Sequence, residues 1–462
     1  MTCRFRPILP IRPFVPSLLF LMLACPAFAV DLPPDAEAVA QVKAGTRAEA
    51  NAAWWGFNSN DVTGAIQGAI DSGAPKVVVP FMGEPWIVRP IMLRSDLELV
   101  FEPGVLILAK KDEFKGGGDS LFRAADEHDI TVRGYGATLR MRKADYQSDA
   151  YERAEWRMGL SFSGCQRVRI EGVRVESSGG DGIYIGSSGK NRWCEDVTIR
   201  DCVSHDNHRQ GISIISAQNL LIENCVFSST KGTPPEAGID LEADSPDERF
   251  VNCVIRNCVM ENNSGHAILV YLNPMTSESE PVSILFENCH ARMGRTAGLV
   301  TDDFDDVNQT GWSGMSVGAI RDDGPQGLIE FRNCTSENTG KEGVKVFDKS
   351  ADSARVRFVN CRWSNPWVSG HRGHGGVRVP VLLNLRRAEL TEKLGGVDFV
   401  DCAVFDYGAR PAVAVEENTT DLGIFDVTGR ITVHGPGGTW TWLSSKQHGV
   451  TLEVVEAPKA EQ

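Results

Sequence analysis

The sequence predicts an all-β solenoid built from three-strand coils, closed at its N-terminal end by a helix. One short phrase recurs, in which β-branched or aromatic residues alternate, Gly, Asn or Asp follows, and Cys usually comes next. Its copies are ITVRGYGA (130–137), VRIEGVRV (168–175), VTIRDCVS (197–204), LLIENCVF (220–227), CVIRNCVM (253–260), ILFENCHA (284–291), IEFRNCTS (329–336), VRFVNCRW (356–363) and VDFVDCAV (397–404). A constant phrase with insertions of varying length between copies is typical of coils that stack one continuous core.

A second strand opened by a small residue lies between successive phrases. It reads GIYIG, GISII, GIDLE, AILVY, GLVTD and GVKVF in chain order. Alternation along these strands assigns an inward set to the core: Ile183, Ile185, Ile212, Ile214, Ile239, Leu241, Ile268, Val270, Val344 and Val346. The outward set comprises Asp181, Tyr184, Gln210, Ser213, Asp240, Glu242, His266, Leu269, Tyr271, Val300, Asp302, Glu342, Lys345 and Phe347. Because coils stack about 4.8 Å apart, the outward side chains form a grid on one face.

Two columns of like residues mark the turn that closes each phrase. The first column is Asp201, Asn224, Asn257, Asn288, Asn333, Asn360 and Asp401. The second column is Cys202, Cys225, Cys258, Cys289, Cys334, Cys361 and Cys402. One cysteine per coil at a single register predicts small inward-facing core residues, since disulfides would not explain the register. The states of Cys165, Cys194 and Cys253, which lie off this column, stay open.

The coil pattern resembles a right-handed parallel β-helix of the pectate lyase and polygalacturonase superfamily, in which stacked Asn residues bridge the turn between the second and third strands. The run from Asn60 through Val105 resembles the opening of polygalacturonases, and GGDGIYIG (179–186) extends the likeness. Polygalacturonases carry an Asp, an Asp pair and a Gly-His-Gly on successive coils. This chain keeps only Asp181, with Arg209-Gln210 and Glu236-Ala237-Gly238 at the other two places. The likeness is closer to secreted bacterial right-handed β-helix repeat proteins, which implies this fold and a polysaccharide context.

The two ends read as caps on one structural domain spanning 30–462. After Asn60, apolar residues at helical spacing predict an amphipathic helix over the N-terminal mouth, followed by the strand KVVVP (76–80). ITVHG (431–435) and TLEVVE (451–456) predict irregular closing strands. The predicted segments are a signal peptide (1–29), the cap and first coils (30–127), the central coils (128–415) and the closing strands with their tail (416–462).

The composition and the N-terminus bound the setting of the protein. A basic start, the apolar run from Phe14 to Ala24 and Ala27-Phe28-Ala29 predict a cleavable signal peptide, hence a secreted or periplasmic location without a membrane span. A net charge of −14 gives no basic footprint for nucleic acid. The expected partner is a polysaccharide or oligosaccharide.

The predicted chemistry centres on the acidic stretch EAGIDLEAD (236–244). Asp240 and Glu242 leave one strand on the same face with Cβ atoms about 7 Å apart. Glycoside hydrolysis uses two carboxyl groups roughly 5 to 9.5 Å apart, so these two are the predicted catalytic residues. Loops at 141–157, 205–210 and 302–324 supply groove walls rich in aromatic, guanidinium and carboxylate groups. The predicted substrate-binding residues are Asp181, Asp206, His208, Arg209, Gln210, His266, Tyr271, Asp302, Trp156, Arg157 and Trp312.

Two other functions compete with hydrolysis. A polysaccharide lyase would abstract a proton from a uronic acid sugar through a His, Tyr, Lys or Arg base. In that case Asp240, Glu242 and Asp244 could hold Ca²⁺ through oxygen ligands, and the acidic loop Asp302–Asn308 is a second Ca²⁺ candidate, although hydrolysis requires no cofactor. A carbohydrate-binding or adhesin solenoid without catalysis is the third reading.

Overall fold

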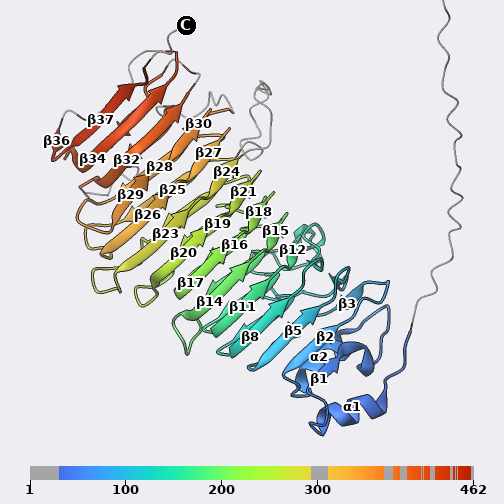
Figure 1. Ribbon diagram of the computed structural model, residues 1–462. Helices are drawn as coiled ribbons and strands as arrows, with labels where there is room; N and C mark the ends of the chain where they lie inside the picture. The colour runs from blue at the N-terminus through green and yellow to red at the C-terminus, as the bar shows by residue number, and fades with distance from the viewer. Residues whose placement is uncertain are drawn as a thin grey trace, which may run out of the picture.

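The computed structural model describes residues 31–292, 311–368, 378–385, 393–406, 408, 410–416, 422–436, 441–442, 444 and 446–458. Within this part, the chain winds into coils that stack in sequence order from one end of an elongated solenoid to the other (Figure 1). Every pairing between named strands is parallel. The predicted all-β parallel β-helix is therefore confirmed.

The described strands form two sheets. The 12-stranded sheet comprises β4 (Ile91–Met92), β7 (Phe122–Ala125), β10 (Leu160–Ser163), β13 (Ile183–Gly186), β16 (Ile212–Ile214), β19 (Ile239–Glu242), β22 (Ile268–Tyr271), β25 (Met315–Ile320), β28 (Val344–Lys349), β31 (Val381–Asn384), β33 (Val413–Glu416) and β35 (Thr441–Trp442).

The 25-stranded sheet contains two ladders side by side, which share β32. The first ladder is β1 (Glu49–Asn51), β2 (Lys76–Val79), β5 (Leu97–Phe101), β8 (His128–Arg133), β11 (Gln166–Glu171), β14 (Cys194–Arg200), β17 (Ala217–Glu223), β20 (Phe250–Arg256), β23 (Val282–Glu287), β26 (Gly327–Arg332), β29 (Arg355–Val359), β32 (Gly395–Phe405), β34 (Ile424–His434), β36 (Gln447–His448) and β37 (Thr451–Glu456). The second is β3 (Trp86–Val88), β6 (Leu106–Ala109), β9 (Thr138–Arg140), β12 (Arg174–Glu176), β15 (Val203–His205), β18 (Val226–Ser228), β21 (Val259–Glu261), β24 (His290–Arg292), β27 (Thr335–Glu337) and β30 (Arg362–Ser364).

Helices lie at the N-terminal end of the solenoid (Figure 1). They are α1 (Ala36–Lys43) and α2 (Thr63–Asp71), with the 3₁₀ turn η1 (Ala52–Trp55) between them, while a second 3₁₀ turn, η2 (Asp145–Gln147), lies in a later loop. The helix predicted after Asn60 is α2, and its buried residues Ile66 and Ile70 join the main core. At the other end, the predicted closing strand TLEVVE is β37, which pairs with β34 in parallel register.

The turn between the two ladders explains the column of Asn and Asp. All seven of its members have a positive φ, a conformation that Asn and Asp tolerate better than other residues with side chains. Their side chains also bond from coil to coil: Asn224 donates to Asp201 at 3.3 Å, and Asn360 donates to Asn333 at 2.8 Å. The predicted turn column is confirmed.

The cysteine column lies inside the solenoid. All ten cysteines after the predicted signal peptide are buried and free, and each thiol of the column contacts backbone carbonyl oxygens, as Cys225 does with Glu223 at 3.2 Å. The off-column cysteines are also buried, and burial raises the pKa of Cys165 to about 11 and that of Cys253 to about 12. The thiols therefore pack in the core, as predicted.

Candidate functional site

The site lies on the outer face of the 12-stranded sheet. The predicted inward set is fully buried, so the alternation that defined the groove face is confirmed. The cross-strand register aligns Tyr184, Ser213, Asp240, Leu269, Ser316 and Lys345 in one outward column. It aligns Glu242, Tyr271, Gly318 and Phe347 in a second column.

One strand of the prediction was misplaced. β22 pairs directly with β25, so Met315–Ile320 occupies the place that GLVTD was expected to fill. The column position after Tyr271 belongs to Gly318, and the placement of Asp302 in that column is wrong. GMSVGAI also opens with a small residue, which is the signal that could have found it. Asp302 and the rest of the acidic loop from Asp303 to Asn308 lie outside the described residues.

Asp240 and Glu242 differ sharply in exposure. Asp240 is fully buried, whereas 27% of the Glu242 side chain is exposed. Burial, reinforced by the charge of Glu242, raises the pKa of Asp240 well above its usual range. The protonated form of Asp240 is therefore favoured, while the partly exposed Glu242 reaches the outer face of the sheet.

Arg209 joins the acids of neighbouring coils. Its guanidinium nitrogens lie 3.2 Å from Glu242, 3.8 Å from Asp181 and 3.9 Å from Glu155. Asp181 is fully buried, and burial raises its pKa to about 7 although Arg209 opposes the shift. Different nitrogens of one guanidinium thus hold Asp181 and Glu242. We call Asp181, Asp240 and Glu242 the acid cluster.

Gln210 orients Asp240, one member of the acid cluster. Its side-chain amide donates to Asp240 at 2.8 Å and accepts from the backbone N–H of Ala237 at 2.6 Å. Gln210 is fully buried, and its two amide ends are bonded to the protein. It therefore orients Asp240 and offers no surface to a ligand, contrary to its predicted binding role.

Two further predicted residues, Asp206 and His208, hold the loops beside the groove in place through hydrogen bonds. Asp206 accepts from Lys143 at 2.8 Å and from Ser177 at 3.0 Å. His208 is 8% exposed and bonds Thr233 at 2.9 Å, and burial lowers its pKa. His208 is thus neutral.

Arg157 is corrected most clearly, because it is fully buried and donates to the carbonyl oxygens of Phe114, Lys115 and Glu152. Its neighbour Trp156 is 56% exposed.

His266, Trp312 and Ser316 form a second group on the same face. The Nδ1 of His266 lies 2.7 Å from the hydroxyl of Ser316, which stands in the same column as Asp240. This contact places His266 on the face of Asp240, as the alternation required. Trp312 meets the His266 ring edge-on at 5.0 Å and lies under Lys341 at 4.7 Å. The predicted site thus holds an acidic part and a His–aromatic part.

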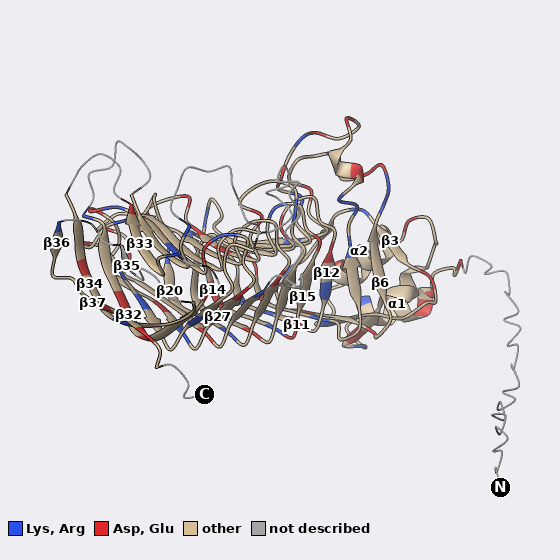
Figure 2. Cartoon of the chain, turned by 90° about the horizontal axis from the view of Figure 1, so that it is seen from above, with Lys and Arg blue, Asp and Glu red and all other residues tan. Residues whose placement is uncertain are grey.

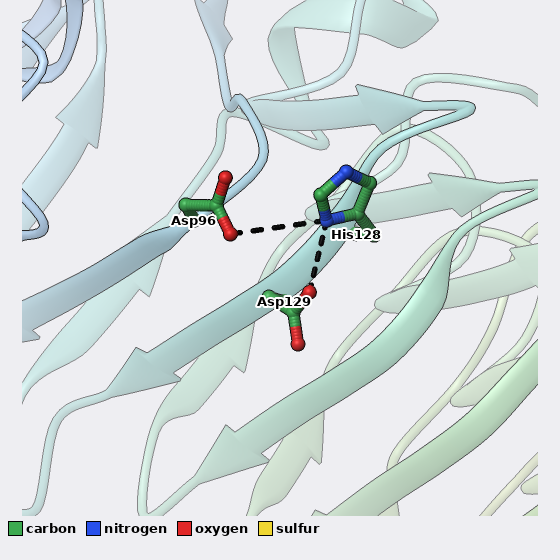
Figure 3. Close-up of side chains that lie close together, drawn as sticks. All are labelled: Asp96, His128 and Asp129. Atoms are coloured by element: carbon green, nitrogen blue, oxygen red, sulfur yellow. Dashed lines mark hydrogen bonds and ion pairs between the residues drawn. The ribbon is translucent and has the colours of Figure 1, made fainter.

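Metal-capable side chains converge elsewhere. Within the described part of the chain, three such residues come together, namely Asp96, His128 and Asp129, and all three are exposed (Figure 3). His128 lies 2.9 Å from Asp129, but Arg167 also binds that carboxylate through two contacts of 2.7 Å. Arg167, followed by His128, lowers the pKa of Asp129 to about 2 against a smaller effect of desolvation. A carboxylate already paired with arginine is a poor metal ligand, and the Ca²⁺ sets named above stay predictions.

Comparison with known proteins agrees with this geometry. A model described as "Right handed beta helix region" matches residues 154–301. The fold is that of the pectate lyase/polygalacturonase-like right-handed parallel β-helix proteins. Two uncharacterized Bacillus subtilis proteins, YclG and the SPbeta prophage-derived YorA, are 28% and 26% identical over 39% and 34% of this chain. The alignments cover only 34% and 28% of those relatives.

Solved β-helices with different activities resemble the chain. The A-module of the mannuronan C-5 epimerase AlgE6 of Azotobacter vinelandii matches with a TM-score of 0.60 and 16% identity over 89% of this chain and 100% of its own. A family 28 exopolygalacturonase of Yersinia enterocolitica matches with a TM-score of 0.58 and 15% identity over 88% of this chain and 78% of its own. PfbA, a surface adhesin of Streptococcus pneumoniae, matches with a TM-score of 0.52 and 14% identity over 81% of this chain and 87% of its own. At these identities the likeness concerns the fold alone.

Proposed function

We propose that the chain is a carbohydrate-active enzyme that hydrolyses glycosidic bonds of a poly- or oligosaccharide at the acid cluster. The observation that carries the proposal is the pairing of a partly exposed carboxyl group, that of Glu242, with two fully buried carboxyl groups, those of Asp181 and Asp240, whose pKa burial raises. Glycoside hydrolysis needs one proton donor and one carboxylate that acts as base or nucleophile. Asp181 and Asp240 are the candidate proton donors, and Glu242 is the candidate base or nucleophile.

Glu242 is the group that meets the sugar in this proposal. Arg209 holds its carboxylate at 3.2 Å. Asp240 is buried behind it and supplies a proton to the pair, with Gln210 fixing its orientation. Asp181, on another nitrogen of Arg209, is the second carboxyl group that can donate. We infer export as well, from the predicted signal peptide, which lies outside the described residues. None of the described helices has the length and apolar character needed to cross a membrane.

The products separate the three candidate functions. Purified protein is incubated with polygalacturonate, mannuronan and a neutral soluble glucan, and both new reducing ends and the absorbance of unsaturated sugar are recorded. Reducing ends without unsaturation support hydrolysis. Unsaturated products would replace it by elimination, for which His208, His266, Tyr271 and Lys345 are the remaining base candidates, because Arg209 is paired with acids. Binding without any cleavage would favour the adhesin reading.

Substitution tests the assigned residues. We expect Glu242→Gln and Asp240→Asn each to lower the rate of hydrolysis by about 10²- to 10⁴-fold, since each removes a proton-transfer group. Glu223→Gln, on the opposite sheet, is the matched control and should leave the rate unchanged. Full activity in both acid-cluster variants would show that the chemistry lies elsewhere.

A further inference from the structure

Two aromatic rings in the groove lie over glycines of the outward columns. A Cβ added to Gly186 would come within 2.6 Å of the ring and hydroxyl of Tyr184, two residues earlier on β13. A Cβ added to Gly318 would come within 2.4 Å of the ring of Phe347, its partner on β28. Because glycine has no side chain, each ring can lie against the sheet.

The rings of Tyr184 and Tyr271 flank Asp240 and Glu242 from opposite directions along the solenoid. β13 lies two coils before β19, about 10 Å away, while Tyr271 on β22 is the direct register partner of Glu242. Phe347, resting on Gly318, reaches back to Tyr271, with ring centres 6.5 Å apart and planes tilted by 30°. Leu269 completes the same small apolar cluster. Tyr184 and Tyr271 are partly exposed, whereas Phe347 is 7% exposed and supports Tyr271 from behind.

We propose that Tyr184 and Tyr271 are sugar-stacking platforms on the two sides of Asp240 and Glu242, so that a bound glycan extends past the cleaved bond in both directions. The aromatic faces present a flat apolar surface, and the phenol groups add hydrogen bonds at the edges. Burial and the charge of Asp244 raise the pKa of Tyr184, which keeps its hydroxyl a donor. The enzyme then cuts within a chain rather than trimming one end. This inference rests on the proposed hydrolytic function and names the form of its substrate.

The test compares platform variants on long and short substrates. Tyr184→Ala and Tyr271→Ala should each raise KM for a long oligosaccharide about tenfold, a loss of the size expected for one stacking contact. Tyr184→Phe and Tyr271→Phe keep the ring and should bind nearly as well as the parent. With the polymer that the wild-type chain cleaves, viscosity should fall early, before many reducing ends appear. Release of short products from one end, or an effect from only one of the two alanine variants, would overturn the inference.

A binding experiment separates this inference from the proposed function. Calorimetry uses Glu242→Gln with oligosaccharides of increasing length cut from polygalacturonate, mannuronan and the neutral glucan. We expect affinity to rise with length until both platforms are covered, and to fall when Tyr184→Ala or Tyr271→Ala is added. Cleavage with length-independent binding would contradict the proposed stacking platforms but would not contradict hydrolysis. Length-dependent binding without cleavage by the wild-type chain would retain the platforms and remove hydrolysis, whereas no binding at all would remove both.

Gly318→Ala provides a control that keeps every aromatic residue. Its Cβ would overlap the Phe347 ring and displace the support of Tyr271, so affinity should fall on that side only. Gly189→Ala, where an added Cβ has nothing within 4 Å, should change neither affinity nor product size.

Discussion

Charged residues are arranged in opposite ways on the two sheets. On the 25-stranded sheet, one column alternates in sign from coil to coil: Arg133, Glu171, Arg200, Glu223, Arg256, Glu287 and Arg332. Ion pairs connect its members, as between Arg200 and Glu171 at 2.8 Å and between Arg256 and Glu223 at 2.7 Å. We call this column the arginine–glutamate ladder. Acidic and basic residues are both spread along the solenoid (Figure 2).

The acid cluster lacks such a balance. Four carboxyl groups surround Arg209, those of Glu155, Asp181, Asp240 and Glu242, and two of them, Asp181 and Asp240, are fully buried. The contrast appears in the pKa values. Burial raises the pKa of Asp398, but hydrogen bonds from Arg355 and Thr428 outweigh it and lower the value to about 2, whereas the pKa of Asp181 rises to about 7. Buried, poorly paired acids cost stability, and this cost supports the proposal that they act in catalysis.

The largest expected effect on stability comes from removing the cation of the acid cluster. Arg209→Met should lower the free energy of unfolding by about 3 kcal/mol at pH 8, because it leaves partly buried carboxylates without a counter-charge. The loss should shrink at pH 5, where protonation relieves the repulsion. Urea denaturation at both pH values measures the difference. An equal loss at both would show that Arg209 acts through packing alone.

A second prediction concerns the opposite pH slopes of two aspartates. An unfolded Asp ionises near pH 3.8, but Asp181 keeps its proton to about pH 7, so its contribution to stability falls as pH rises between these values. Asp181→Asn should therefore gain stability relative to the parent as pH rises from 4 to 8, by on the order of 4 kcal/mol.

Asp398→Asn serves as the contrasting variant. The folded pKa of about 2 means that Asp398 contributes stability above pH 3.8 that is lost as pH falls toward 2. Its substitution should cost stability at pH 7 and little near pH 2. Parallel slopes for the two variants would contradict the electrostatic contrast between the sheets.

The smallest expected effect is in the arginine–glutamate ladder. Arg256→Met should cost less than about 1 kcal/mol, because the Arg256 side chain is 42% exposed in its ion pair with Glu223 and water screens the charge. Hydrolytic activity should stay unchanged. A loss as large as that of Arg209→Met would remove the distinction between the two sheets.

The sequence predicted the fold well because the coil is a local repeat. Asn224 and Cys225 occupy a turn and a core position that recur along the repeat, so spacing identified the core position and the resemblance to parallel β-helices assigned Asn224 to the turn. The same repeat contained the arginine–glutamate ladder, since Arg200, Glu223 and Arg256 each immediately precede the turn residue, yet this alternation of sign was not recognised.

Burial at the site was harder to predict. Alternation correctly placed Asp240 and Glu242 outward, but it could not show that one is covered and the other exposed. Arg157 and Gln210 have polar groups of the kind that bind ligands. In the structure, however, Arg157 donates to loop carbonyl oxygens and Gln210 donates to the carboxyl group of Asp240. GLVTD resembled a groove strand as closely as GMSVGAI does, because both satisfy a pattern of one small residue and alternating apolar residues.

The buried cysteine column allows the unfolding of the solenoid to be followed through the reactivity of its thiols. Seven successive coils contribute one thiol each to the column, and all of these thiols are buried. If these coils detach one by one, the number of thiols that react with a chemical probe counts how many of the seven have come apart. Cooperative collapse would instead release all of them together. The spacing that serves packing in the native state thus makes the route of unfolding directly countable.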